Sequence, residues 1–186
     1  MSSIYSENLI KEVIDNSESD FWNSAVLEWD IDDVIEDQDN DSSCICGKEN
    51  IRYLFTIKNF QNGNTLFPIG SSCIKKFNRV DLNEITSINE TLFKLFHAVK
   101  ENEFISLNSN YFSRKLLKYL LEQGGFKPNK YNNYNAENDY RFMLDMFNKR
   151  KESSDKQKSK IRAIIVTSIR PFLEGQLSDK VVGEKD

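Results

Sequence analysis

The N-terminal part of the chain changes from a helical to a strand-like hydrophobic pattern. Apolar residues of 6–15 recur at spacings of three and four, and Ser6 is a suitable N-cap, which predicts a short amphipathic helix. Residues 25–35 instead alternate apolar and acidic side chains, with Trp29 and Ile31 on one side and Asp30 and Asp32 on the other. We therefore expect a strand that has one acidic face.

Two further strand patterns, at residues 51–59 and 65–69, are joined by a turn that contains Asn62 and Gly63. Asn-Gly strongly indicates a β-hairpin, because both residues tolerate positive φ. The rest of the chain is mostly helical in pattern. Helices are predicted at residues 73–77, 88–100, 110–123, 136–151 and 154–173.

The net charge of −4 conceals a division along the chain. Residues 1–41 contain 13 of the 29 acidic residues and only one of the 25 basic residues, Lys11, so this segment carries −12. Residues 42–186 therefore carry +8. The overall acidity argues against a nucleic-acid partner, but the positive charge of residues 42–186 means that such a partner stays a candidate.

The hydropathy pattern also indicates in which compartment of the cell the protein is found. No apolar run reaches the roughly 18 residues of a membrane span, and the N-terminus lacks the basic start and apolar stretch of a signal peptide. We therefore expect a soluble protein of the cytoplasm that does not associate with membranes. A reducing cytosol keeps the three cysteines as thiols, so a metal site is favoured over a disulfide framework.

The cysteines form the most informative motif. Cys44 and Cys46 are separated by one residue and followed by Gly47, which lets the backbone fold back. The predicted hairpin then returns the chain to Cys73, at the start of a short helix. A knuckle, a hairpin and a ligand-bearing helix make the treble-clef plan for tetrahedral zinc. The alternative is that the three thiols are buried and packed as small apolar groups.

The fourth zinc ligand lies outside this motif. His97, the only histidine, falls on the predicted helix 88–100 and would complete a Cys₃His set, whereas Asp41, Ser43 or a water molecule could close the shell instead.

The zinc is expected to be structural, and no enzymatic activity is expected. Three thiolates lower the Lewis acidity of zinc, which disfavours a hydrolytic role. An HNH-type nuclease would need at least two histidines. Deaminase, phosphate-loop and nucleophile-elbow motifs are absent from the sequence.

The stretch 44–77, with its C-x-C-G motif, its hairpin and its G-S-x-C-I-K-K-F motif, resembles a small zinc module of Firmicutes. This module recurs in uncharacterised phage, prophage and mobile-element proteins. The resemblance implies a non-catalytic, metal-stabilised module. In size, acidity and zinc motif the chain is also similar to prophage metalloproteins that inhibit type II CRISPR effectors, the anti-CRISPR proteins that block Cas9.

Two functional classes follow from these observations. The first is an inhibitor that docks through an acidic surface on a basic host defence nuclease and blocks the loading of DNA onto Cas9. A solvated acidic face with a disordered loop would explain the same residues equally well. The residues expected to make this protein–protein contact are Glu28, Asp30, Asp32, Asp33, Glu36, Asp37, Asp39 and Asp41.

The second class is a nucleic-acid-binding accessory protein of a phage or mobile element. Basic clusters on the predicted helices, beside several tyrosines, would make the contacts, and the acidic leader would mask them. Any one cluster is more often a solvated helix face. The clusters comprise Lys75, Lys76 and Arg79, then Arg114, Lys115 and Lys118, then Lys149, Arg150, Lys151, Lys156, Lys158, Lys160 and Arg162, with Tyr131, Tyr134 and Tyr140.

Together these patterns predict an α+β fold. A small treble-clef-like zinc module with a three-stranded antiparallel sheet is followed by a helical C-terminal half. The expected divisions are an acidic N-terminal helix and strand in residues 1–41, the zinc module in 42–79, a helical region in 80–174 and a flexible tail in 175–186.

Overall fold

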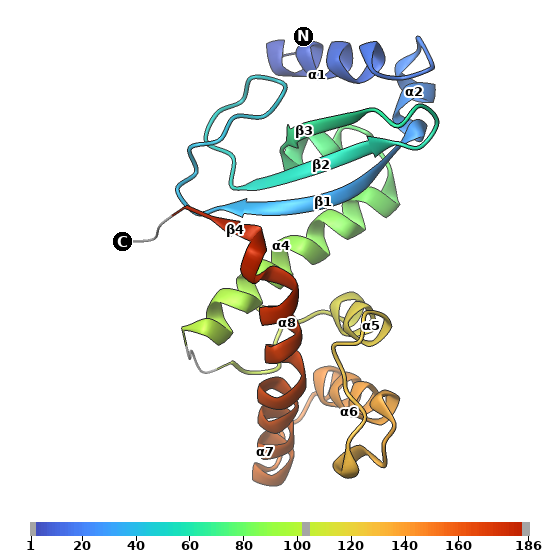
Figure 1. The fold of residues 1–186 in the computed structure, drawn as a ribbon. Helices are drawn as coiled ribbons and strands as arrows, with labels where there is room; N and C mark the ends of the chain where they lie inside the picture. Colours follow the sequence, from blue (N-terminus) through green and yellow to red (C-terminus); the bar gives the residue numbers. More distant parts are fainter. Residues whose placement is uncertain (1–2, 102–104, 184–186) are drawn as a thin grey trace. The chain divides into compact units, whose positions relative to one another are not determined.

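The computed structural model describes residues 3–101 and 105–183, and the chain divides into two compact units (Figure 1). Unit 1 comprises residues 1–89 and 179–186, and unit 2 comprises residues 90–178. Helix α4, Val80–Lys100, contributes residues to both units. The strands lie in unit 1 and unit 2 is helical, so the predicted α+β class is confirmed.

A four-stranded sheet organises unit 1, in the order β3-β2-β1-β4. Strands β1, β2 and β3 are antiparallel, as expected, but β4 runs parallel to β1. The sheet is therefore mixed, and the prediction of a three-stranded antiparallel sheet is wrong. The strand bounds are Trp29–Asp37 for β1, Tyr53–Asn59 for β2, Thr65–Ile69 for β3 and Val181–Val182 for β4.

The returning C-terminal segment explains this difference. Without β4, the outer side of β1 would be a sheet edge with unpaired backbone groups. Val181 and Val182 pair with the end of β1, and the ammonium of Lys180 contacts the carboxylate of Asp33 at 2.7 Å. The flexible tail predicted from the sequence covers residues 175–186. Residues 175–183 of this segment are described in the structure, and residues 184–186 lie outside the described residues.

A β-bulge changes which side chains of β1 face the core. The register with β2 slips by one residue between Ile31 and Asp33, so Asp32 is the extra residue. A one-residue slip reverses the alternation of a strand, and beyond the bulge Val34, Glu36 and the last residue, Asp37, are buried. The strand therefore does not present one continuous acidic face.

The N-terminal helix α1, Ile4–Asp15, packs against the rest of unit 1 through Leu9 and Val13, which are fully buried. Its N-cap is Ser3 and not Ser6, because the Ser3 hydroxyl accepts a hydrogen bond from the Ser6 N–H. Residues 25–28, expected to start a strand, instead form the end of helix α2, Trp22–Ala25, and a 3-10 turn, Val26–Glu28. Helix α3, Ser71–Lys75, follows β3 directly.

Unit 2 packs short amphipathic helices around leucine, isoleucine and methionine side chains. The helix predicted over residues 154–173 is interrupted by a π-helical segment, Ile165–Ile169. Pro171 follows in the first turn of the next helix, and its missing N–H and bulky ring account for the altered hydrogen bonding. The helices are α5, Arg114–Glu122; α6, Ala136–Asn148; α7, Asp155–Ile164; and α8, Arg170–Leu177.

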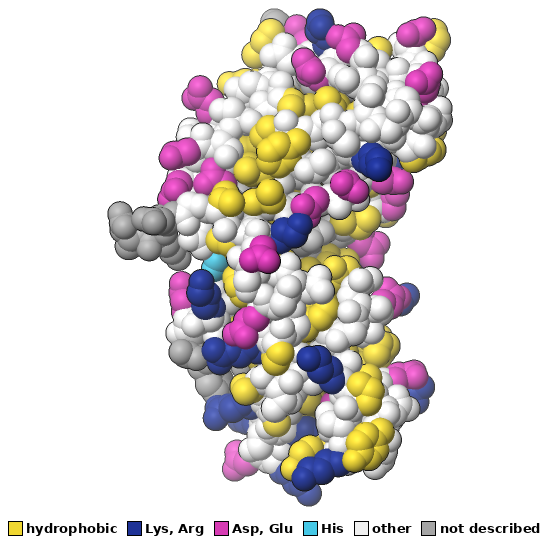
Figure 2. All heavy atoms as spheres, in the orientation of Figure 1, with side chains coloured by type: hydrophobic (Ala, Val, Ile, Leu, Met, Phe, Trp, Pro, Cys, Tyr) yellow, Lys and Arg dark blue, Asp and Glu magenta, His cyan; other side chains and the backbone are white. Residues whose placement is uncertain are grey.

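The two units differ in charge. Unit 1 contains 9 basic and 19 acidic residues, which is −10, and unit 2 contains 16 basic and 10 acidic residues, which is +6. Figure 2 shows acidic side chains over unit 1 and most of the visible Lys and Arg side chains over unit 2. None of the helices within residues 3–101 and 105–183 has the length and apolar character needed to cross a membrane.

Candidate metal centre

A tight backbone turn places Cys44 and Cys46. The Gly47 N–H donates to the Cys44 carbonyl at 2.8 Å, and the Cys44 N–H donates to the Lys48 carbonyl at 2.8 Å. Gly47 has φ of 92°, in the left-handed region that glycine adopts without a steric penalty. The Ile45 N–H bonds the Pro68 carbonyl at 2.9 Å, which ties this turn to β3.

The third cysteine is brought to the turn by the hairpin. Strand β3 ends at Ile69, Gly70 is the N-cap residue of α3, and Cys73 lies in α3. The Gly70 N–H also donates to the sulfur of Cys44 at 3.3 Å. Two segments that are distant in the sequence are therefore held in register by backbone hydrogen bonds.

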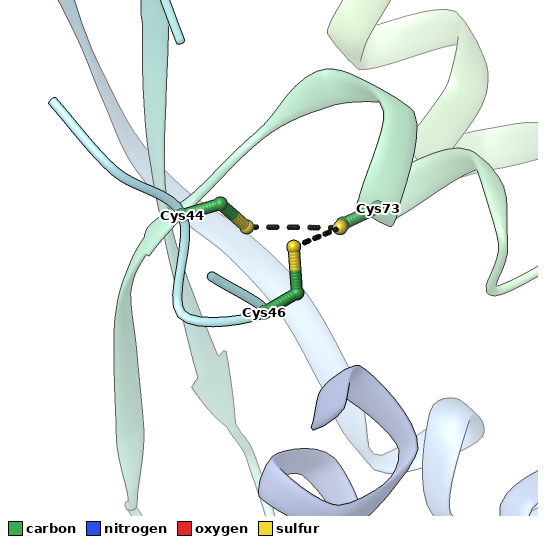
Figure 3. A group of neighbouring side chains, drawn as sticks. All are labelled: Cys44, Cys46 and Cys73. Atoms are coloured by element: carbon green, nitrogen blue, oxygen red, sulfur yellow. Dashed lines mark hydrogen bonds between the residues drawn. The ribbon is translucent and has the colours of Figure 1, made fainter. Parts of the chain in front are cut away.

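The three sulfur atoms point toward one another (Figure 3). The Sγ atoms of Cys44 and Cys73 are 3.6 Å apart, and those of Cys73 and Cys46 are 3.4 Å apart. All three lie within 4.8 Å of one another. Ligands that are about 2.3 Å from a tetrahedral zinc ion lie about 3.8 Å apart, so small adjustments would accommodate a metal ion.

The cysteine cluster is closed to solvent. Cys46 is fully buried, and Cys44 and Cys73 are 4% and 2% exposed. Three soft sulfur donors in a buried position fit a thiophilic metal ion. The prediction that Cys44, Cys46 and Cys73 come together at a potential metal site is confirmed, whereas the identity of the metal is a proposal.

The pKa values of the thiols respond to their mutual contact. A hydrogen bond from the Cys73 thiol is the largest cause that lowers the pKa of Cys44, and the N–H groups of Cys46 and Gly70 add to it. Together they outweigh the effect of burial and bring the pKa to about 5. The pKa of Cys73 is raised, because its proton is shared with Cys44 and because the thiol is buried. The contact between the thiols therefore favours a thiolate within the cluster, and a thiolate is the form that binds metal ions.

Helix α1 covers the turn that carries Cys44 and Cys46. The amide of Asn8 donates to the Cys46 carbonyl at 3.0 Å, and the ring of Tyr5 lies beside Gly47. The ammonium of Lys76, just after α3, donates to the hydroxyl of Ser6 at 2.9 Å. Residues near the N-terminus therefore form an outer layer around the potential metal ligands.

The other expected ligands are not in the cluster. Among the described residues, the His, Cys, Asp and Glu side chains that converge here are the three cysteines. His97 lies in the last turn of α4, in unit 2, and its ring contacts that of Phe96. Asp41 is exposed, and its backbone N–H donates to Asp37. Ser43 is exposed at the start of the turn.

Three of the eight acidic residues expected on a docking face are buried. The carboxylate of Glu28 is 3% exposed and accepts hydrogen bonds from the N–H groups of Glu18 and Ser19 and from the amide of Asn59. Burial tends to raise the pKa of Glu28, but these hydrogen bonds outweigh it and lower the pKa. Glu28 therefore links residues 18–19 to Asn59, the last residue of β2.

The other two buried carboxylates lie at the end of β1. Glu36 is fully buried and pairs with Arg52 at 2.6 Å. Asp37 is 5% exposed and bonds the turn that follows it. Asp30 and Asp33 form ion pairs with Arg79 and Lys180, and the exposed members of the set that remain are Asp32, Asp39 and Asp41.

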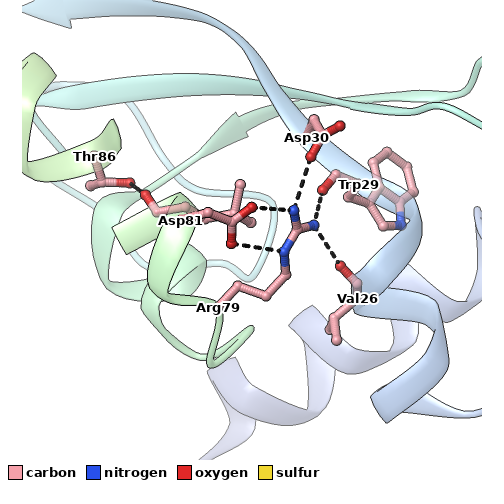
Figure 4. Close-up of polar contacts among 7 residues, drawn as sticks. Val26, Trp29, Asp30, Arg79, Asp81 and Thr86 are labelled. Atoms are coloured by element: carbon pink, nitrogen blue, oxygen red, sulfur yellow. Dashed lines mark hydrogen bonds and ion pairs between the residues drawn. The ribbon is translucent and has the colours of Figure 1, made fainter. Parts of the chain in front are cut away.

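Arg79 has a structural role that the sequence pattern did not reveal (Figure 4). The sequence pattern predicts an exposed basic cluster of Arg79 with Lys75 and Lys76, yet the Arg79 side chain is only 16% exposed. The guanidinium donates to the carbonyls of Val26 and Trp29 and pairs with Asp30 at 3.0 Å and Asp81 at 2.6 Å. It thereby joins the start of β1 to the start of α4.

Comparisons of this chain with protein-family models, with curated proteins and with solved structures find no match.

Proposed function

We propose that Cys44, Cys46 and Cys73 hold one structural zinc ion and that unit 1 is a non-catalytic, metal-stabilised binding module. The observation that carries this proposal is the convergence of three buried sulfurs from two separate segments. Free buried thiols that merely fill a core have no reason to lie in mutual contact. Thiolate ligands favour Zn²⁺ over the harder Mg²⁺ and Ca²⁺ ions.

A structural role fits the surroundings of the cluster better than a catalytic one. Catalytic zinc needs an open position for water and a nearby base, whereas these sulfurs are almost completely buried. The order of knuckle, hairpin and helix supports a treble-clef arrangement. The sheet of unit 1 is small, and a metal that links its loops would contribute directly to folding.

Substitution with Co²⁺ tests the ligand set. Thiolate ligands give Co²⁺ intense charge-transfer absorption, and tetrahedral geometry gives strong visible bands. We expect both signals from the intact chain and a weaker charge-transfer band from each of the three Cys→Ser variants. Pale, octahedral-type spectra from the intact chain would contradict a sulfur-ligated site.

For the partner of this module, we propose a basic protein surface, such as that of a host defence nuclease of the Cas9 type. The charge of −10 on unit 1 supports this choice. Effectors of this class carry nucleic acid in positively charged channels, so an acidic module from a phage or prophage could block DNA loading. Asp32, Asp39 and Asp41 are the exposed candidates for contact.

A pull-down with Cas9 and its guide RNA tests this partner. We expect the intact chain to be retained, and we expect the triple variant Asp32→Asn, Asp39→Asn and Asp41→Asn to bind at least tenfold more weakly. Retention that is equal for the intact chain and the triple variant would contradict docking through these aspartates. The matched control removes three exposed acids from unit 2 and should leave binding unchanged: Glu122→Gln, Glu137→Gln and Asp145→Asn.

A second candidate function, nucleic-acid binding, is favoured by the charge of +6 on unit 2. This function would reside in a different unit from the cysteine cluster, so both can be present in one chain.

A further inference from the structure

A loop of unit 2 exposes two tyrosines. Tyr131 and Tyr134 are 79% and 74% exposed, although tyrosine rings usually bury most of their surface. They lie between α5 and α6, around a short 3-10 turn, Lys130–Asn132. Neither the cysteine cluster nor the acidic surface of unit 1 involves these residues.

Hydrogen bonds around Asn132 fix the shape of this loop. The Asn132 side chain is 2% exposed, and its amide nitrogen donates to the carbonyl of Lys127 and the carboxylate of Asp139, each at 2.8 Å. Its amide oxygen accepts from the Asn129 N–H at 2.8 Å. The Asn138 amide donates to the Asn132 carbonyl at 2.9 Å. The two tyrosines therefore project from a rigid support.

The backbone at the second tyrosine is strained. Asn133 and Tyr134 both have φ of 56°, in the left-handed region. Asparagine adopts this region with little penalty, but a bulky aromatic residue does not. The Tyr134 N–H bonds the Asn129 carbonyl at 2.8 Å, which closes the loop in this conformation. Strain of this kind occurs where a side chain must point in a particular direction for function.

Positive charge surrounds the exposed rings. The ammonium of Lys130 lies 4.9 Å from the centre of the Tyr131 ring, and Lys127 is exposed at the other end of the loop. Within residues 3–101 and 105–183, neither lysine forms a salt bridge. The nearby acid Glu137 is paired with Arg141 at 2.7 Å, and Asp139 is buried.

We propose that residues 127–135 bind a single-stranded nucleic acid, with bases stacked on Tyr131 and Tyr134 and phosphates contacted by Lys127 and Lys130; this inference rests on the second candidate function, nucleic-acid binding. Exposed aromatic rings beside cations that form no salt bridge are a combination that proteins use for single strands, since every base offers a flat face. The positive charge of unit 2 favours a polyanion over a neutral or basic protein surface.

Fluorescence anisotropy with a labelled oligothymidine of about 15 nucleotides tests the proposal on the full, zinc-loaded chain. We expect saturable binding that weakens steeply between about 50 and 200 mM salt. Tyr131→Ala and Tyr134→Ala should each weaken binding about tenfold, and the double variant about a hundredfold. Tyr→Phe changes at the same positions should keep most of the affinity, because the ring and not the hydroxyl stacks on the base.

A matched control is Phe21→Ala, which removes a ring that is 75% exposed on unit 1 and should leave binding unchanged. Far-ultraviolet circular dichroism of each variant must match that of the intact chain. The proposal is overturned if the double alanine variant binds as tightly as the intact chain. Binding of duplex DNA as tight as that of the single strand would overturn it as well. A parallel titration with the same sequence in RNA shows which of the two single strands the loop prefers.

Discussion

The carboxylate of Asp37 accepts a hydrogen bond from the hydroxyl of Ser42 at 2.7 Å. It also accepts from the N–H groups of Asp39, Asp41 and Ser42 at 3.0–3.1 Å. Asp37 is the last residue of β1, and Cys44 follows Ser42 by two residues. A single buried carboxylate therefore shapes the turn that delivers the first cysteine to the cluster.

Replacing Asp37 with asparagine should destabilise the protein by about 2 kcal/mol at pH 7, because an amide cannot accept all of these hydrogen bonds. The free energy of unfolding, measured by urea denaturation at fixed zinc concentration, checks this. The control is Asp32→Asn at the exposed bulge of β1, for which the change should be under about 0.5 kcal/mol. Equal effects of the two substitutions would contradict this role.

The hydrogen bonds between Asp37 and Ser42 also predict that the stability of the fold depends on pH. Burial would raise the pKa of Asp37, but the Ser42 hydroxyl and the backbone N–H groups outweigh it, so the pKa is lowered. A lowered pKa in the folded state means that the carboxylate stabilises the fold fully above its unfolded pKa, near 3.9. The stability difference between the intact chain and Asp37→Asn should shrink as pH falls from about 4 through the lower folded pKa. A difference that grows in acid would show that the sign is wrong.

Arg79→Lys should destabilise unit 1 by about 2 kcal/mol. Lysine keeps the charge but lacks the planar fork that reaches two carbonyls and two carboxylates at once. Thermal or urea unfolding measures the loss. Arg141→Lys is the matched control, since Arg141 is 68% exposed and paired with Glu137 one helical turn away, and should cost under about 0.5 kcal/mol. If both variants unfold alike, Arg79 does not join the two elements as described.

His97→Ala tests the fourth ligand. His97 was the candidate from the sequence, but in the structure it stands outside the group of converging ligands. We therefore expect the variant to retain its zinc content and the zinc dependence of its unfolding temperature. A loss of zinc equal to that in Cys46→Ser would identify His97 as a ligand after all.

Local patterns predicted some parts of this protein well. The bounds of β3, at residues 65–69, agree with the alternation of the sequence, and the C-x-C-G motif with Cys73 predicted the sulfur cluster. These features depend on residues close together or on a strong turn signal at Asn62 and Gly63. A hairpin of defined register then brings the third cysteine to the first two.

Features that depend on distant partners could not be predicted. The two residues of β4 are too few to form a pattern, and their pairing with β1 spans most of the chain. The bulge at Asp32 leaves no local signal, yet it directs Glu36 inward. Glu28 and Arg79 look like ordinary surface charges until the carbonyl, amide and N–H groups around them are known.

Metal analysis of the purified chain tests the central claim most directly. Elemental analysis of protein prepared without added metal should give about one zinc per chain, and removal by a chelator should cause loss of folded structure that added zinc restores. Each of Cys44→Ser, Cys46→Ser and Cys73→Ser should reduce the zinc content. A folded chain that contains no metal and binds none when zinc is added would contradict the account.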